Sequence, residues 1–249
     1  IPDFAWALMN VHWPGPLTLI LPRRAHVATG SAAGQTSIGL RSPSHPVAQA
    51  LLRTARGLGV HGVAGPSANR FGRVSPTHSR HVVAEFGPGL DVLDGGACEV
   101  GIESTIVDCT RAQPVLLRPG MLGVDTLSAT IGREILTPER AQTALRQASP
   151  KASGTLASHY APNARLRLLT SEEIEAAAQA LTPDQRRRVG VWSPNPPGAA
   201  GLIWRAMPAD PAQCAQALFQ TLRALEDEQV NEIWVLPPPL GVAWDGIRD

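Results

Sequence analysis

Residues 137–163 are the part of the sequence that most limits how this chain can fold. They are rich in Ala, Gln, Ser and Pro, carry no strand pattern, and hold at most one short helix, over 138–147. Segments of this composition usually connect domains instead of building a core. We therefore predict a linker over 137–163, a first domain over residues 1–136 and a second, smaller domain over 164–249.

On both sides of this linker, short apolar runs alternate with amphipathic segments. Strands are predicted in the first part at 17–21, 37–41, 60–64, 91–93, 104–109 and 115–117, and helices at 5–12, 46–58, 77–86 and 125–131. In the second part, strands are predicted at 166–169, 188–192, 202–206 and 232–236, and helices at 171–181 and 211–228. This alternation is typical of α/β folds, and the second part predicts a small doubly wound, Rossmann-like domain.

Composition narrows the class of protein. The formal net charge is +1, which gives little support to nonspecific nucleic-acid binding. No stretch approaches the roughly 20 apolar residues that cross a bilayer, and the first residues lack a basic signal-peptide region. The three cysteines, at positions 98, 109 and 214, are too few and too dispersed for a disulfide framework or a zinc site. We expect a cytoplasmic protein without membrane contact.

The run from Gly65 to Pro76 is the strongest local signal for function. It follows the predicted strand 60–64, which would put small residues at the carboxyl end of a strand, where open α/β sheets bind ligands. Its hydroxyl and amide groups come from Ser67, Asn69 and Ser75. A loop of oriented N–H groups favours an anion such as phosphate.

Two arginines at predicted strand ends, Arg41 and Arg118, and the small-residue turn before Ser104 complete a set of polar groups. Such a set suits a polyanion bound beside a small polar molecule, as in an adenylate-forming reaction. The residues are equally compatible with an ordinary turn and surface arginines.

Other chemistries have weaker support. Ser67 could act with His61 and either Asp94 or Asp108, but Asn69 occupies the place of the second Gly in the G-x-S-x-G motif of serine hydrolases. The histidines lack metal-ligand spacing. His159 and Tyr160, at the end of the linker, are compatible with either an apolar anchor or a lid over a nucleotide.

Several ordered motifs resemble a known family. WPGPLT at 13–18, GPSAN at 65–69, GIESTI at 101–106 and LLRPG at 116–120 resemble YrdC-like domains, and SHYAP at 158–162 followed by an α/β domain is similar to the long, two-domain form of threonylcarbamoyl-AMP synthase. The resemblance implies a YrdC-like twisted open sheet with flanking helices in the first domain. It also implies that L-threonine, bicarbonate and ATP give L-threonylcarbamoyladenylate and pyrophosphate.

The resemblance further implies which molecules and residues take part. ATP would be a substrate with Mg²⁺, without a bound prosthetic group or a protein nucleophile. The product would pass to tRNA threonylcarbamoyl-transfer proteins, so that contact with tRNA itself is indirect or weak. The residues implied to bind threonine are Arg41, Gly65 and Ser104, and those implied to bind ATP are Ser37, Ser67, Asn69, Ser75, Arg118 and Tyr160.

The chain also departs from the family pattern. The threonine-rich strand and the Lys-x-Arg motif expected near the start of a YrdC-like domain are not in the sequence, and it ends where the family continues into a closing helix. We therefore expect a fragment clipped at both ends, whose own activity is open. A YrdC-like RNA-binding module without catalysis is the alternative function, although the arginines are scattered along the sequence.

Overall fold

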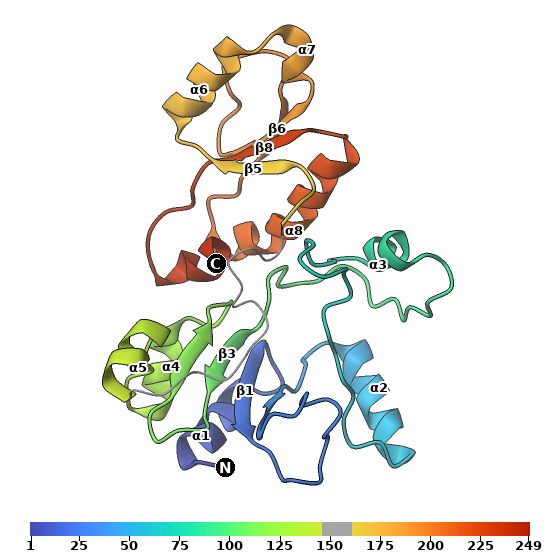
Figure 1. Cartoon of the computed structure of the whole chain (residues 1–249), viewed down its shortest axis with the longest axis vertical. Coiled ribbons are helices and arrows are strands. Elements are labelled where there is room, and N and C mark those ends of the chain that lie inside the picture. Colours follow the sequence, from blue (N-terminus) through green and yellow to red (C-terminus); the bar gives the residue numbers. More distant parts are fainter. Residues whose placement is uncertain (146–160) are drawn as a thin grey trace. The chain divides into compact units, whose positions relative to one another are not determined.

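The computed structural model describes residues 1–145 and 161–249, which fall into two compact units (Figure 1). One unit comprises residues 1–66, the described part of 103–156, and Asp249. The other comprises residues 67–102 and the described part of 157–248. Each unit groups residues that contact one another in space, whereas each predicted domain is one continuous range of the sequence. The two divisions are not the same kind of boundary, so the domain boundaries stay a prediction. Within the described ranges, no helix combines the length and apolarity that a bilayer span requires.

The first unit is built on a mixed four-stranded sheet with the order β2-β1-β3-β4. Its strands are β1 (Leu17–Pro22), β2 (Ser37–Leu40), β3 (Thr105–Asp108) and β4 (Val115–Arg118), and its helices are α1 (Asp3–His12), α2 (Pro46–Gly57), α4 (Val124–Ile131) and α5 (Pro138–Leu145). The central strands β1 and β3 are parallel, and each pairs with an antiparallel edge strand. This is the open sheet with flanking helices that the sequence predicts.

Alternation along β1 divides the residues of this sheet between two faces. Leu17, Leu19 and Leu21 are buried against side chains of α1 and α4, such as Leu8 and Leu127. Ile20 points the other way and packs in a smaller cluster that extends to α5.

The second unit holds a four-stranded, all-parallel sheet with the order β5-β8-β6-β7. The strands are β5 (Arg165–Leu168), β6 (Val189–Ser193), β7 (Ile203–Ala206) and β8 (Glu232–Val235), and the helical elements are α3 (Ser79–Phe86), α6 (Ser171–Ala180), α7 (Pro183–Arg186), α8 (Pro211–Asp227), the 3₁₀ turn η1 (Val242–Trp244) and α9 (Asp245–Arg248). Helix α6 begins at a capping box formed by Thr170 and Glu173.

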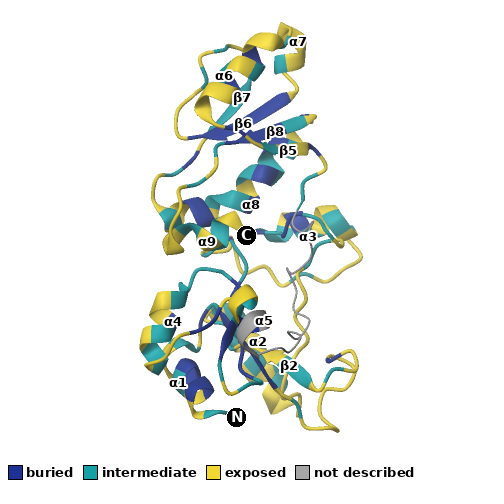
Figure 2. Ribbon diagram, turned by 60° about the vertical axis from the view of Figure 1, so that its left-hand side comes forward, coloured by how far each residue is buried: buried dark blue, intermediate teal, exposed yellow. Residues whose placement is uncertain are grey.

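Helices cover both faces of this parallel sheet, as the doubly wound prediction requires. Val191 and Trp234 pack with α6, whereas Trp192 and Ile233 pack with α8. Figure 2 shows these two helices on opposite sides of the sheet. Because both faces are buried, β6 is buried at every residue. The α8 side of this core also includes Val74, which is 1% exposed and comes from the 67–102 part of the unit.

Two predicted strands are wrong. Residues 60–64 and 91–93 form no strand, and Val60 and Val63 are 46% and 56% exposed. A strand needs a neighbour for its backbone groups, and none of the described residues forms a ladder with either segment. The Gly65–Pro76 loop therefore does not follow a strand, which corrects the strand-end position that the sequence predicts.

Gly101 marks a close approach between the 67–102 segment and α8. Its φ is +80°, and a Cβ atom there would lie 2.4 Å from the Cα atom of Gln216. Gly96 has a matching φ of +87° but open space around it. The two glycines thus share a backbone conformation and differ in packing.

Comparing Gly101→Ala with Gly96→Ala should separate packing from backbone strain. We expect Gly96→Ala to cost about 1 kcal/mol of unfolding free energy through the positive φ alone. Gly101→Ala should cost about 3 kcal/mol or more, because the backbone of α8 must also shift. Urea unfolding measures both values, and equal losses would contradict the close approach.

His81 in α3 is a buried base within the same unit. It is 7% exposed, and its Nδ1 accepts a hydrogen bond from the Thr77 backbone N–H at 3.1 Å. Burial, reinforced by the positive charges of Arg223 and Arg80, lowers the pKa of His81 from 6.5 to about 4. Nearby His78 also lowers this pKa and Asp227 raises it.

This shift predicts a specific pH dependence. Between pH 6.5 and about 4, the unfolded chain protonates His81 while the folded chain does not, so stability falls with falling pH by up to about 3 kcal/mol. His81→Gln should flatten the slope of unfolding free energy between pH 6.5 and about 5.5, where nearly all carboxylates are still ionised. The same change at the exposed His61 is the control, and an unchanged slope in His81→Gln would contradict the assignment.

Candidate functional site

The strand register of the first sheet gathers four of the predicted site residues on one face. Ser37 pairs with Pro22 and Gly39 with Ile20, so both lie on the Ile20 face, and the alternation continues to Arg41 just after β2. Across the sheet, Thr18 pairs with Ile106, and Ile106 pairs with Arg118. Ser104 lies two residues before Ile106 and so belongs to the same face.

Ser104 is the most tightly held residue of this face. Its Oγ lies 2.8 Å from the Thr18 Oγ1, which fixes the hydroxyl from the β1 side. From the β4 side, Nε and Nη2 of Arg118 donate to the Ser104 carbonyl at 3.0 and 2.8 Å, and Nη2 donates to the Ser104 Oγ at 3.1 Å. Ser104 and Arg118 are 6% and 5% exposed. Two predicted site residues, Ser104 and Arg118, are thus joined in one buried hydrogen-bonded cluster.

The backbone around Ser104 is equally constrained. Glu103, immediately before it, lies 3.7 Å from the Arg118 guanidinium. A Cβ atom at Gly120 would lie 2.5 Å from the Thr105 nitrogen and 2.7 Å from the Glu103 carbonyl oxygen, so the chain can pass there only as glycine. The start of β3 is therefore held in place by direct backbone packing.

Arg41, Ser37 and Gly65 are more open. Arg41 is exposed, and its Nε donates to the Gly15 carbonyl at 3.0 Å, which holds the arginine beside the chain entering β1. Ser37 is half-buried at the start of β2, and Gly65 lies exposed in an irregular segment. A guanidinium group at the rim of a hydroxyl-bearing face can pair with a carboxylate in a bidentate manner.

The loop residues Ser67, Asn69 and Ser75 belong to the second unit. Ser67 is exposed, whereas Ser75 is 6% exposed. The Asn69 Nδ2 donates to the carbonyl of Arg70 at 2.9 Å and to that of Arg73 at 3.1 Å, which fixes the orientation of its amide. The Asn69 Oδ1 is buried and has no hydrogen-bond partner among the described residues. Such an orphaned acceptor needs a donor from a ligand or water.

Tyr160, and with it His159, lies outside the described residues. In the ranges that are described, no group of three or more His, Cys, Asp or Glu side chains could hold a metal ion. Of the two aspartates considered for a hydrolase, Asp108 is already engaged by Thr110 at 2.7 Å and Arg111 at 3.0 Å, whereas the exposed Asp94 accepts the Gly96 backbone N–H at 2.9 Å.

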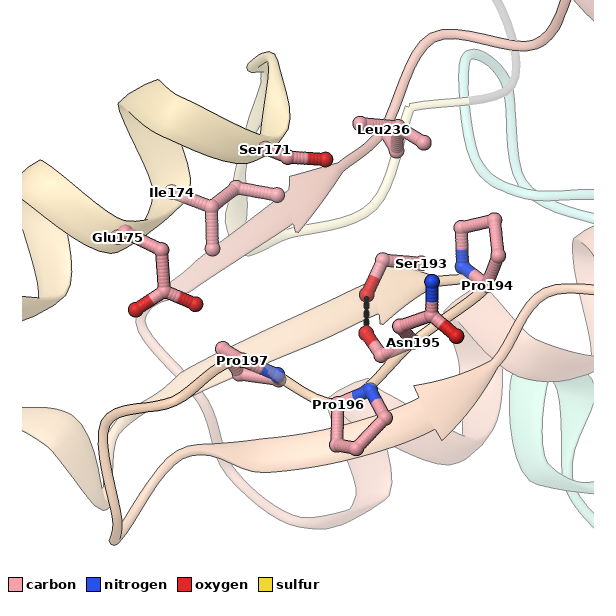
Figure 3. Close-up of a pocket in the computed structure, with 9 residues that line it drawn as sticks. All are labelled: Ser171, Ile174, Glu175, Ser193, Pro194, Asn195, Pro196, Pro197 and Leu236. Carbon is pink, nitrogen blue, oxygen red and sulfur yellow. Dashed lines mark hydrogen bonds between the residues drawn. The ribbon is translucent and has the colours of Figure 1, made fainter.

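A separate pocket of about 230 Å³ lies in the second unit (Figure 3). It opens where β6 and β8 end and α6 begins, and Figure 3 shows Glu175 of α6 across from Pro197. The lining residues are Ser171, Ile174, Glu175, Ser193, Pro194, Asn195, Pro196, Pro197 and Leu236. None of the predicted site residues that the structure describes lines this pocket, so the sheet face of the first unit remains the candidate site.

Thr18 is the residue of this site that sequence reasoning missed. It is a polar residue within the apolar run of β1, and a polar side chain in such a run indicates a candidate site residue. Its role became visible only when pairing between β1 and β3 brought it to Ser104.

Comparison with known proteins links both parts of the chain to one family. The Sua5, YciO and YrdC family model, described as telomere recombination, matches residues 1–120. A model described as threonylcarbamoyl-AMP synthase, C-terminal domain, matches residues 123–249. Curated proteins called threonylcarbamoyl-AMP synthase match at 31% identity in Pyrococcus abyssi (94% of this chain, 68% of that protein) and 33% in Bacillus subtilis (93% and 67%).

A solved structure extends this likeness to three dimensions. The crystal structure of Pyrococcus abyssi Sua5 complexed with L-threonine matches with a TM-score of 0.83 and 29% identity, covering 100% of this chain and 73% of the other. The chain therefore belongs to the Sua5 family and has the two-domain form of the threonylcarbamoyl-AMP synthases.

Proposed function

We propose that this protein is an L-threonylcarbamoyladenylate synthase, which forms threonylcarbamoyl-AMP and pyrophosphate from L-threonine, bicarbonate and ATP. The observation that carries the proposal is the single sheet face shared by Ser37, Arg41, Ser104 and Arg118. Two cationic and two hydroxyl side chains lie on that face, with Ser37 at the opposite end of β2 from Arg41. Family membership and the threonine-bound relative support the choice of substrate.

On this proposal, Arg41 binds the threonine carboxylate through its guanidinium fork. Ser104 binds the amino-acid substrate with a hydroxyl that Thr18 and Arg118 keep oriented. The Gly65 backbone completes the threonine site. A preoriented hydroxyl favours binding because the ligand does not have to order it.

ATP is proposed to contact Ser37, Ser67, Asn69, Ser75, Arg118 and Tyr160. Asn69 has the best support among these residues, because its Oδ1 is a buried acceptor without a partner among the described residues. Hydroxyl and amino groups of adenosine are donors of the required kind. Mg²⁺ would arrive with the triphosphate as part of the substrate.

The proposed reaction needs no nucleophile from the protein. The threonine amine adds to the carbon of CO₂, which forms from bicarbonate by loss of water, and the nitrogen releases a proton to give a carbamate. A carbamate oxygen then attacks the α-phosphorus of ATP, and pyrophosphate leaves with the electron pair of the broken P–O bond. The protein would contribute positioning and positive charge where negative charge develops.

The setting of the reaction is proposed as well. Cys109 and Cys214 are buried free thiols, which suits a reducing cytoplasm. The unstable product would be taken over by tRNA threonylcarbamoyl-transfer proteins, for modification of an adenosine beside the anticodon.

Formation of threonylcarbamoyl-AMP tests the proposed function. The protein with MgATP, L-threonine and bicarbonate should release pyrophosphate and form the adenylate in equal amounts. With ¹³C-bicarbonate the product mass should rise by one unit, because its carbamoyl carbon comes from that substrate. Liquid chromatography with mass spectrometry measures both, and pyrophosphate release that does not depend on threonine would contradict the proposal.

Two single variants should separate the substrate sites. Arg41→Ala should raise the KM for threonine about tenfold or more, because a carboxylate loses its charged partner, with a much smaller change for ATP. Asn69→Ala should do the opposite and raise the KM for ATP. Steady-state kinetics with each substrate varied in turn measures both, and equal effects on the two substrates would remove these residues from their assigned roles.

A further inference from the structure

We infer that helix α8 of the C-terminal domain positions the proposed ATP loop, and that Arg223 is the residue through which it does so. The inference rests on the proposed function, because it concerns how Asn69 and Ser75 are held. Both ends of the contact lie within the second unit. It assigns a role in the reaction to a domain that otherwise lies outside the predicted site residues.

Arg223 connects three groups of the loop region at once. Its Nε donates to the Ser75 carbonyl at 3.3 Å, and its Nη2 donates to the neighbouring Val74 carbonyl. The same Nη2 pairs with the Glu85 Oε1 at 2.9 Å, and the Arg223 and Glu85 side chains are 11% and 8% exposed. A planar guanidinium can engage two successive carbonyls and a carboxylate together, whereas the single ammonium of lysine cannot match that geometry.

A second side chain of α8 holds the loop one residue earlier. The Glu226 Oε1 pairs with Arg73 at 3.3 Å and accepts the Asn163 backbone N–H at 2.5 Å. The Gly72 carbonyl accepts the Ala161 N–H at 2.9 Å. Residues 72–75 are thus fixed by backbone pairing, the Arg73–Glu226 ion pair, the hydrogen bonds from Arg223 and the buried Val74 side chain.

These anchors lead directly to Asn69. Its Nδ2 donates to the carbonyls of Arg70 and Arg73, so its orientation depends on where those two residues lie. Arg73 is held by Glu226, and the Arg70 backbone N–H and Nε both donate to Glu85, at 3.3 Å each. Because Glu85 is also the partner of Arg223, movement of α8 would change the direction of the Asn69 Oδ1, which has no partner among the described residues. Misplacing a ligand-binding group by about 1 Å is enough to impair catalysis.

The test compares two lysine substitutions in the whole protein. Arg223→Lys keeps the positive charge but removes the planar guanidinium that contacts two carbonyls and a carboxylate. It should raise the KM for ATP about tenfold while changing the KM for threonine less than about twofold. Arg205→Lys is the matched control, because Arg205 also pairs with a glutamate, Glu228, at 2.8 Å, but on the exposed surface. It should leave both KM values unchanged. Equal effects of Arg223→Lys on the two substrates, or equal effects of the two variants, would overturn the inference.

Hydrogen–deuterium exchange gives a readout that does not need activity. In Arg223→Lys, amides of residues 70–77 should exchange faster, while those of β6 and β8 should keep their protection. Glu85→Gln is the second variant if Arg223→Lys fails to fold, and it should loosen the same amides to a smaller extent. Unchanged exchange at 70–77 in the folded variant overturns the inference. Absence of adenylate formation by the unmodified protein overturns the proposed function instead, and the exchange result still decides whether α8 holds the loop.

Discussion

Parallel pairing of β1 with β3 is the constraint on which the candidate site depends. It brings Thr18 beside Ser104, and the antiparallel edge strands then bring Arg118 from one side and Gly39 from the other. Because side chains alternate with a period of two along β1, a shift of one residue in its pairing with β3 would turn the polar face into the core. The buried leucines of β1 prevent such a shift, since they must face α1 and α4. Core packing and site geometry are therefore set by the same register.

Buried arginines perform a related role in both units. Arg118 fixes the start of β3, and Arg223 fixes residues 74 and 75 of the loop. Buried ion pairs are weak evidence for stability, because desolvation offsets much of their attraction. Their contribution here is to hold specific backbone carbonyls in one arrangement. This suits the proposed reaction, in which the protein would position two substrates and supply no nucleophile.

The sequence predicted the fold well where a residue pattern is local. The alternating runs and helix starts located all eight strands of the two described sheets, and family motifs singled out Ser104 and Arg118 before any geometry was known. The predicted strand at 60–64 failed because apolar composition does not supply a pairing partner. The contacts of Arg223 could not be predicted, because they join residues more than a hundred positions apart in the sequence. The buried Asn69 Oδ1 could not be predicted either, because it depends on how the amide side chain is oriented.

Calorimetric titration of L-threonine tests most directly whether the polar face of the first sheet is the amino-acid site. We compare Ser104→Ala, on that face, with Leu40→Ala, which lies on the opposite face and is 43% exposed. The account predicts one threonine site in the unmodified protein, affinity weakened about tenfold by Ser104→Ala, and affinity unchanged by Leu40→Ala. Threonine binding that is insensitive to Ser104→Ala, or as sensitive to Leu40→Ala, would contradict it.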